Sequence, residues 1–167
     1  MAIEPERVEP IFDGTLIRVV RETWPEGIRE LVHHPGAAAV VPLVGDDVLL
    51  VRQLRQSIRA TTLEIPAGIL DKEGESPAEC AARELREETG HRAEDVRALG
   101  LVHTSLGFTD ERIELFTCRA VPEGEPEEEG IEVVRMPFAE AVAAVRDGRI
   151  TDAKSVAALL LAGDRRR

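Results

Sequence analysis

Residues 76–90 read Ser-Pro-Ala-Glu-Cys-Ala-Ala-Arg-Glu-Leu-Arg-Glu-Glu-Thr-Gly, and this stretch predicts the best-defined helix of the chain. Ser76 can cap the helix, Pro77 suits its first position, and Glu79 completes a capping box. Gly90 can supply the left-handed residue that ends the helix. Small and apolar residues recur between these caps at helical spacing, so we expect one narrow face to pack closely against a sheet.

The same helix carries an acidic stripe. Glu84, Glu87 and Glu88 stand at positions i, i+3 and i+4, so their side chains share one side of the helix. Each pair of like charges at this spacing costs about 0.2–0.5 kcal/mol. A divalent cation would relieve the repulsion, since carboxylates and phosphate oxygens are the ligands that Mg²⁺ prefers. The alternative is a solvated face on which Arg83 and Arg86 pair with the glutamates.

Apolar runs and turn residues predict the remaining elements. The expected strands cover residues 16–20, 37–44, 48–53, 99–103, 112–118 and 131–136, and two further helices lie near residues 138–146 and 152–161. Pro42 favours an edge position or a bulge for its strand. Residues 122–130 lack large apolar side chains and predict an exposed acidic loop. This order of elements indicates an α+β or α/β sandwich with a mixed sheet.

Length and charge narrow the class of protein. The 167 residues fit one domain, and the formal net charge of −11 argues against non-specific nucleic-acid binding. Two cysteines make no disulfide framework, and we expect both to be structural thiols. The acidic N-terminus lacks the apolar segment of a signal peptide, and the longest apolar stretch, residues 37–44, is too short to span a membrane. These features predict a cytoplasmic protein without a membrane or nucleic-acid partner.

Three segments together extend the pattern around the helix. Leu-Glu-Ile-Pro-Ala-Gly at residues 63–68, Gly74-Glu75, and Arg-Glu-Leu-Arg-Glu-Glu-Thr-Gly at residues 83–90 resemble the Nudix box of the Nudix hydrolases. This sequence departs from the usual Nudix box at two points. Gly68 and Glu75 enclose six residues instead of five, and His91 stands where the box ends on an aliphatic residue. We expect the loop of residues 69–74 to absorb the extra residue. The resemblance implies an α/β/α sandwich with a mixed β-sheet and a loop–helix–loop box.

The resemblance also implies a metal site for Mg²⁺ or Mn²⁺ beside the substrate diphosphate. Its main ligands would be Glu84 and Glu88, with Glu87 as a ligand or as support and the backbone carbonyl of Ala67 as a further ligand. Gly68, Glu75 and Arg83 would support the box, Arg83 by pairing with a glutamate such as Glu75. Metal across a diphosphate polarises phosphorus and activates a bound water.

A base is still needed because the box glutamates hold the metal. In relatives that hydrolyse ADP-ribose, a glutamate in the loop before the next strand serves as base or as extra ligand. Alignment on the strand at residues 131–134 points to Glu127 as base and Glu129 as an additional metal ligand, with the register open by one residue. The alternative is a merely solvated acidic loop.

Segments outside the box resemble the ADP-ribose pyrophosphatase branch. They are Val-Arg-Gln-Leu-Arg at residues 51–55, Gly-Phe-Thr-Asp-Glu at residues 107–111, and Gly-Arg-Ile-Thr-Asp-Ala-Lys at residues 148–154. The resemblance implies that Arg55 contacts the diphosphate and that Ser105 and Glu111 line the side of the terminal ribose. Glu64 is either a site residue or structural. Leu106 replaces a proline usual in the branch, which leaves room for another nucleotide sugar or a dinucleotide as substrate.

The expected function is hydrolysis of ADP-ribose to AMP and ribose 5-phosphate. Relatives in the branch are homodimers, so we expect residues 1–36 to form N-terminal strands for dimerisation and residues 37–167 to form the hydrolase domain. Phe12 or Trp24 could stack on a nucleobase or simply pack. Two alternatives remain open: hydrolysis of another nucleotide sugar or dinucleotide, and a non-catalytic ligand-sensing domain on the same fold.

Overall fold

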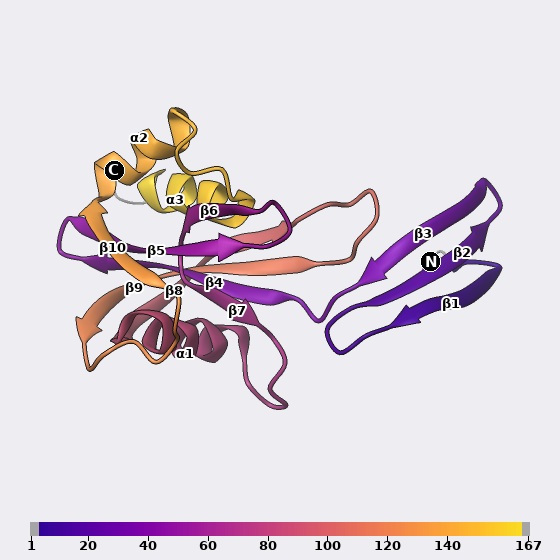
Figure 1. Ribbon diagram of the computed structural model, residues 1–167, viewed down its shortest axis with the longest axis horizontal. Helices are drawn as coiled ribbons and strands as arrows, with labels where there is room; N and C mark the ends of the chain where they lie inside the picture. The colour runs from indigo at the N-terminus through magenta and orange to yellow at the C-terminus, as the bar shows by residue number, and fades with distance from the viewer. Residues whose placement is uncertain (1–3, 165–167) are drawn as a thin grey trace.

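A seven-stranded sheet forms the centre of the molecule, and a separate three-stranded sheet extends from one end (Figure 1). The computed structural model describes residues 4–164. The strands are β1 (Arg7–Asp13), β2 (Arg18–Trp24), β3 (Gly27–His33), β4 (Ala37–Val44), β5 (Asp47–Arg55), β6 (Ala60–Glu64), β7 (Ala67–Ile69), β8 (His91–His103), β9 (Arg112–Pro122) and β10 (Glu132–Pro137). The helices are α1 (Pro77–Thr89), α2 (Phe138–Arg146) and α3 (Ala153–Asp164).

The main sheet is mixed, as the sequence predicted. Its strands lie in the order β10-β5-β4-β9-β8, with β6 beside β5 and β7 beside β4. The pairing of β4 with β9 is parallel, and the other pairings in this sheet are antiparallel. β4 therefore runs through the middle of the sheet, where it pairs with β9 along one side and with β7 and then β5 along the other.

The expectation that Pro42 marks an edge strand or a bulge is wrong. Pro42 is fully buried on the central strand β4, opposite Cys118 of β9. On the other side of β4, pairing with β7 ends at Ala39 and pairing with β5 begins at Leu43. The amide of Val40 points to that side, where it donates to the carbonyl of Pro66. The proline nitrogen, two residues on, faces the same gap, so the sheet loses no hydrogen bond there.

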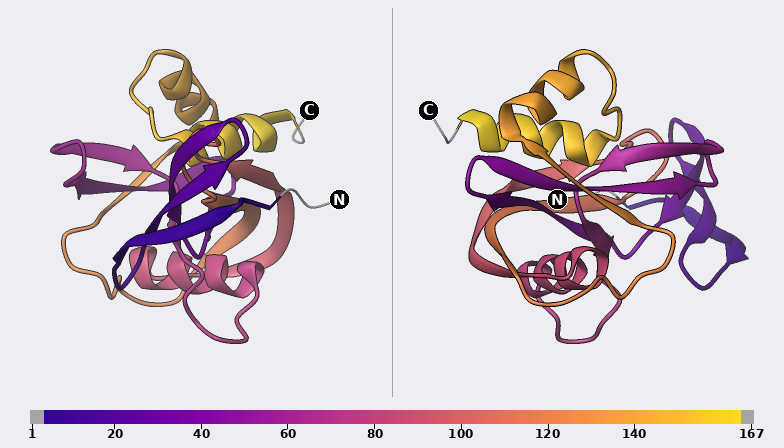
Figure 2. Two further views of the ribbon diagram at one scale, coloured as in Figure 1. Left: turned by 90° about the vertical axis from the view of Figure 1, so that its right-hand side faces the viewer. Right: turned by 60° about the vertical axis from the view of Figure 1, so that its left-hand side comes forward.

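Helices cover both faces of the main sheet (Figures 1 and 2). Alternate residues of β4 point to opposite faces, so Ala37, Ala39 and Val41 pack in the core under α2 and α3. Ala38 and Val40 pack in the core over α1. This second core contains both cysteines, where burial raises the pKa of each thiol to about 12. The α/β/α sandwich expected from the sequence is confirmed.

Helix α1 begins and ends as its sequence predicts. Ser76 accepts a hydrogen bond from the amide of Glu79, and the Glu79 side chain reaches back to the amide of Ser76 at 2.8 Å. Gly90 ends the helix with φ of 70°. The loop before the helix absorbs the extra residue of the box, because Glu75 still reaches Arg83 at 2.7 Å.

Four strands were not predicted as separate elements, namely β1, β3, β6 and β7. β1 is exposed along nearly its whole length, so it lacks the alternation of a half-buried strand. β7 has only three residues. The strand expected at residues 99–103 begins at His91 in the structure. The sequence pattern missed its first part because two irregularities in the pairing of β8 with β9 interrupt the alternation of buried and exposed residues.

The N-terminal sheet is fastened to the main body by the loop that precedes β9. Val32 donates to the carbonyl of Phe108 at 2.7 Å, and Nδ1 of His33 lies 2.6 Å from Oδ2 of Asp110. Figure 1 shows this sheet standing clear of the sandwich. It carries exposed apolar side chains on several strands and turns: Val8, Ile11, Phe12, Leu16 and Ile28. Within residues 4–164, no helix is long and apolar enough to cross a membrane.

Candidate active site

Three carboxylates meet where the end of α1 faces the acidic loop. One oxygen from each of Glu84, Glu87 and Glu128 lies within 4.8 Å of the others. Glu84 is buried, Glu87 is half-buried and Glu128 is exposed, so the group opens to solvent on one side. Several carboxylate oxygens at this spacing suit a hard divalent cation, which takes oxygen ligands. The donor set therefore fits Mg²⁺ or Mn²⁺.

Backbone hydrogen bonds hold the acidic loop against the helix. The last carbonyls of an α-helix have no partner within the helix. Here the carbonyl of Glu87 accepts from the amides of Glu127 at 2.7 Å and Glu128 at 3.2 Å. The carbonyl of Gly90 accepts from Glu123 at 2.9 Å and from Gly124 at 3.0 Å. The loop thus satisfies the end of α1, and this contact brings a loop carboxylate to the helix.

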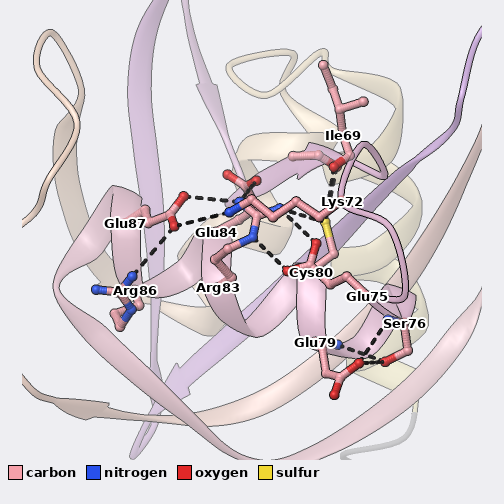
Figure 3. A network of polar contacts seen from close by, with 11 residues as sticks. Ile69, Lys72, Glu75, Ser76, Glu79, Cys80, Arg83, Glu84, Arg86 and Glu87 are labelled. Carbon is pink, nitrogen blue, oxygen red and sulfur yellow. Dashed lines mark hydrogen bonds and ion pairs between the residues drawn. The ribbon is translucent and has the colours of Figure 1, made fainter.

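Arg83 joins the box glutamates into one network (Figure 3). Its guanidinium donates to both carboxylate oxygens of Glu75, at 2.7 and 2.9 Å. It also donates to Glu84 at 2.5 Å and to Glu87 at 3.0 Å. The hydrogen bond that Arg83 donates to Glu75 raises the pKa of Arg83, so the guanidinium stays charged. Arg83 pairs with Glu75, as the resemblance implied, and at the same time offsets charge on two of the expected metal ligands.

Glu88 lies behind this group, on the sheet side of α1. It is only 4% exposed, and its Oε2 accepts from the amide of Ala67 at 3.3 Å. Burial raises its pKa to about 8, and the nearby charges of Glu128 and Glu84 add to that shift. A carboxylate in this position is destabilised unless a cation lies close to it.

The absence of a side chain at Gly68 leaves room for the carboxylate of Glu84. A Cβ at residue 68 would lie 1.9 Å from Cδ of Glu84, so only glycine leaves room for that carboxylate. Ala67 and Gly68 also line a cleft of about 610 Å³. The acidic group and the cleft are therefore neighbours across β7.

A second charged network lies in the wall of the cleft. Glu64 is 2% exposed and accepts from Nε and Nη2 of Arg55 at 2.7 and 2.6 Å. Lys154 and Thr62 donate to it at 2.5 Å each. Burial opposes ionisation of Glu64, but these donors outweigh it and lower its pKa to about 2. Arg55 and Glu64 thus pair with each other, and both line the cleft.

Lys154 and Asp152 are cleft residues to which the sequence analysis gave no role, although both lie in the segment 148–154 that resembles the branch. Asp152 precedes α3, and its Oδ2 accepts from the amide of Ser155 at 3.0 Å and from Lys154 at 2.9 Å. The Asp-x-x-Ser spacing was available as a helix-start signal. Lys154 gave no such signal, because its partner Glu64 is 90 residues away in sequence.

The residues expected at the sugar side fall into two groups. Glu111 lines the cleft, and Thr104 holds its carboxylate with a hydrogen bond of 2.7 Å. The structure places Thr104, and not Ser105, in the wall of the cleft. The Ser105 carbonyl instead accepts from Phe108 and Thr109 in a turn. Leu106, at the tip of this turn, is 82% exposed.

Of the two loop glutamates named from the sequence, neither belongs to the carboxylate group within residues 4–164. Glu127 pairs with Arg86. Glu129 is exposed. The loop residue whose carboxylate joins those of Glu84 and Glu87 is Glu128, which lies between Glu127 and Glu129 in the sequence. This lies within the register left open by one residue.

Comparison with known proteins shows which family the chain belongs to. Residues 33–159 match the NUDIX domain. The chain is 35% identical over 164 residues to a methanol dehydrogenase activator from Bacillus methanolicus, covering 92% of this chain and 88% of the relative. It is 36% identical over 162 residues to an ADP-ribose pyrophosphatase from Bacillus subtilis (strain 168), covering 90% and 87%. A crystal structure of an ADP compounds hydrolase superposes with a TM-score of 0.80 and 26% identity, covering 97% and 92%.

The chain belongs to the Nudix family. The expected Nudix fold, an α+β sandwich, and membership among relatives of the ADP-ribose pyrophosphatases are confirmed. These relatives also support the expected class of enzyme, a pyrophosphatase that hydrolyses nucleoside diphosphate derivatives.

Proposed function

We propose that this enzyme uses Mg²⁺ or Mn²⁺ to hydrolyse the diphosphate linkage of ADP-ribose to AMP and ribose 5-phosphate. The observation that carries the proposal is the carboxylate group of Glu84, Glu87 and Glu128, which adjoins the cleft that contains Arg55. A bound divalent cation would polarise the phosphoryl group and lower the pKa of an attacking water.

The proposal assigns separate roles in metal binding, in support of the box and in substrate binding. Glu84, Glu87 and Glu88, with the carbonyl of Ala67, hold the metal, while Gly68, Glu75 and Arg83 keep the box in shape. Arg55 contacts the diphosphate and Glu64 holds Arg55. Glu111 contacts the terminal ribose, with Ser105 in the same loop. Burial and hydrogen bonding support the assignments to the box, and position along one cleft supports those of Arg55, Glu64, Ala67, Gly68 and Glu111.

The loop carboxylate supplies the base or an additional ligand. The sequence favours Glu127 as base and Glu129 as ligand. The position of Glu128 beside Glu84 and Glu87 favours Glu128 for one of these tasks. Substitution of the three glutamates one at a time separates these assignments.

A second substrate class is a nucleotide sugar other than ADP-ribose. The exposed Leu106 favours it, because the turn at residues 105–109 lies next to Thr104 and Glu111 of the cleft. A panel of ADP-ribose, GDP-mannose, UDP-glucose and diadenosine diphosphate, assayed with Mg²⁺ and with Mn²⁺, tests both classes. AMP plus ribose 5-phosphate as the products of the best substrate would support the primary proposal.

The non-catalytic alternative is tested on the same panel. The intact acidic group argues against a sensing domain, which needs no metal cage. We expect Glu84→Gln and Glu88→Gln each to abolish turnover. Unchanged turnover in both variants would refute the proposed mechanism.

We also propose that the protein is a cytoplasmic homodimer that assembles through residues 1–36. The exposed apolar side chains of the N-terminal sheet support this, since exposed apolar patches mark interaction surfaces. The net charge of −11 supports a protein without nucleic-acid partners.

A further inference from the structure

Arg86 lies in the last turn of α1 and bridges this helix to the acidic loop of residues 122–130. Its Nη1 donates to Oε1 of Glu127, and its Nη2 lies 3.5 Å from Oε1 of Glu87. Figure 3 shows Arg86 directed toward Glu87. One guanidinium therefore contacts a carboxylate of the helix and a carboxylate of the loop at the same time.

The charges at the end of α1 oppose closure of the acidic loop. The carbonyl end of an α-helix carries a partial negative charge, which repels carboxylates. The loop nevertheless places the amides of two successive glutamates, Glu127 and Glu128, on the carbonyl of Glu87. Closure also brings a carboxylate oxygen of Glu128 within 4.8 Å of oxygens of Glu84 and Glu87. A cation between helix and loop offsets this repulsion and stabilises the closed loop.

The other cations near the carboxylate group do not supply this contact. Arg83 donates to three glutamates of the box. Nζ of Lys72 lies 3.9 Å from an oxygen of Glu87. Among residues 4–164, only Arg86 pairs with a carboxylate of the acidic loop. The charge balance of the closed loop thus depends on this residue.

We propose that Arg86 is a positioning residue of the active site, which holds the acidic loop closed on α1 before metal and substrate bind. Because Arg86 engages Glu127, the carboxylate of the next residue, Glu128, stays beside Glu84 and Glu87. Glu127 is then the anchor of the loop, and Glu128 acts as base or ligand. This inference rests on the proposed function, since it concerns the placement of the loop carboxylate in the same site.

Hydrogen exchange of the full chain in EDTA measures closure of the loop without turnover. The amides of Glu127 and Glu128 are protected while they donate to Glu87, and they exchange when the loop opens. We expect Arg86→Met to speed the exchange of both amides about threefold to fivefold, the range of an exposed ion pair. Arg86→Lys keeps the charge and is expected to recover part of the protection.

A double-mutant cycle tests whether the ion pair is the cause. Glu127→Gln should speed exchange by about the same factor as Arg86→Met, and the two substitutions together should add no further increase. Two matched controls should leave the exchange of the loop unchanged. Glu125→Gln removes another exposed carboxylate of the same loop, and Arg149→Met removes an exposed arginine outside it. Fully additive effects of the two substitutions in the pair would overturn the proposal.

Titration with Mn²⁺ in the absence of substrate, followed by electron paramagnetic resonance, gives a second readout. We expect Arg86→Met to weaken Mn²⁺ binding about threefold, because the carboxylate of Glu128 is in place for less of the time. A pure charge effect has the opposite direction, since removal of a cation near carboxylates strengthens the binding of another cation. Tighter Mn²⁺ binding in Arg86→Met, or loop exchange equal to that of the wild type, would overturn the proposal.

The proposed function fails separately, if the wild type with Mg²⁺ or Mn²⁺ hydrolyses nothing in the panel. The exchange experiment requires neither substrate nor metal, so its result still decides whether Arg86 holds the loop. Faster exchange in Arg86→Met supports that role even in a protein without turnover, and unchanged exchange refutes it even in an active enzyme.

Discussion

The amide of Glu128 donates to the carbonyl oxygen of Glu87 at 3.2 Å, and the side chains of the same two residues belong to one carboxylate group with Glu84. The hydrogen bond between the two backbones and the grouping of the side chains both follow from the way α1 ends. The carbonyl of Glu87 lies in the last turn of α1, where no helical amide remains to pair with it. A loop that satisfies this carbonyl must bring its own side chains to the same place.

Neutralising the loop glutamates one at a time separates their roles. We expect Glu128→Gln to lower kcat by about 10²–10⁴-fold, the range of a general base, or to weaken metal binding if Glu128 is a ligand. Glu129→Gln is the control, because Glu129 is exposed and lies outside the carboxylate group. The kinetics at saturating and at limiting Mg²⁺ distinguish base from ligand. A larger loss in Glu129→Gln than in Glu128→Gln would contradict the placement.

Adding one methyl group to Gly68 is expected to damage the metal site more than the fold. The new Cβ would lie 1.9 Å from Cδ of Glu84, so the flexible carboxylate must move away from its partners. We expect Gly68→Ala to weaken metal binding by an order of magnitude or more, with a small change in melting temperature. Gly107→Ala, where no atom lies within 4 Å of the new Cβ, is the matched control. Titration with Mn²⁺, followed by electron paramagnetic resonance, measures the affinity.

Glu88 makes the metal-free protein less stable at higher pH. Burial raises the pKa of Glu88 from an ordinary 4.5 to about 8, so the folded protein holds a proton that the unfolded chain releases. Stability therefore falls as pH rises from about 4.5 to about 8 and is constant with respect to this group above that range. We expect the melting temperature in EDTA to fall across this window, measured by circular dichroism.

Glu88→Gln and added metal test the origin of that slope. The variant has no carboxyl to titrate, so its EDTA melting curve should vary less with pH. Metal binding favours the ionised carboxylate, so added Mg²⁺ should raise the melting temperature more at pH 8 than at pH 5. A wild-type slope that persists in the variant would assign the effect to other groups.

Glu64 gives the stability of the fold a pH dependence opposite in sign to that of Glu88. Arg55 and Lys154 lower the pKa of Glu64 to about 2 against the opposing effect of burial. A carboxylate with a lowered pKa stabilises the fold above its ordinary pKa of 4.5 and loses that effect as pH falls toward 2. We expect Glu64→Gln to lower the melting temperature at pH 7 by several degrees and to have a smaller effect near pH 3. An effect of equal size at both values would contradict the ionised state of Glu64.

The proposed homodimer is tested at the N-terminal sheet. Ile28 is 61% exposed, and we expect Ile28→Glu to shift the protein from dimer to monomer in light scattering after size-exclusion chromatography. Leu160→Glu is the control, since Leu160 is 40% exposed on α3, far along the chain from this sheet. Monomers for the wild type at micromolar concentration would exclude this assembly.

The sequence by itself determined α1, its caps and the side of the helix that its glutamates share. The capping box, Gly90 and the stripe of glutamates are relations between residues at most a few positions apart, so the period of a helix places them without knowledge of the rest. Long buried strands such as β4 and β5 were predictable for a similar reason, because their apolar runs are continuous.

Only the tertiary structure decided which distant residues meet. Glu64 and Lys154 come together because β6 and the start of α3 lie side by side, and neither residue carries a local sign of the other. The acidic loop has no period from which its register could be read. Its register is set by the carbonyls of Glu87 and Gly90 at the end of α1, and those hydrogen bonds place Glu128, rather than its neighbours, with the glutamates of the helix.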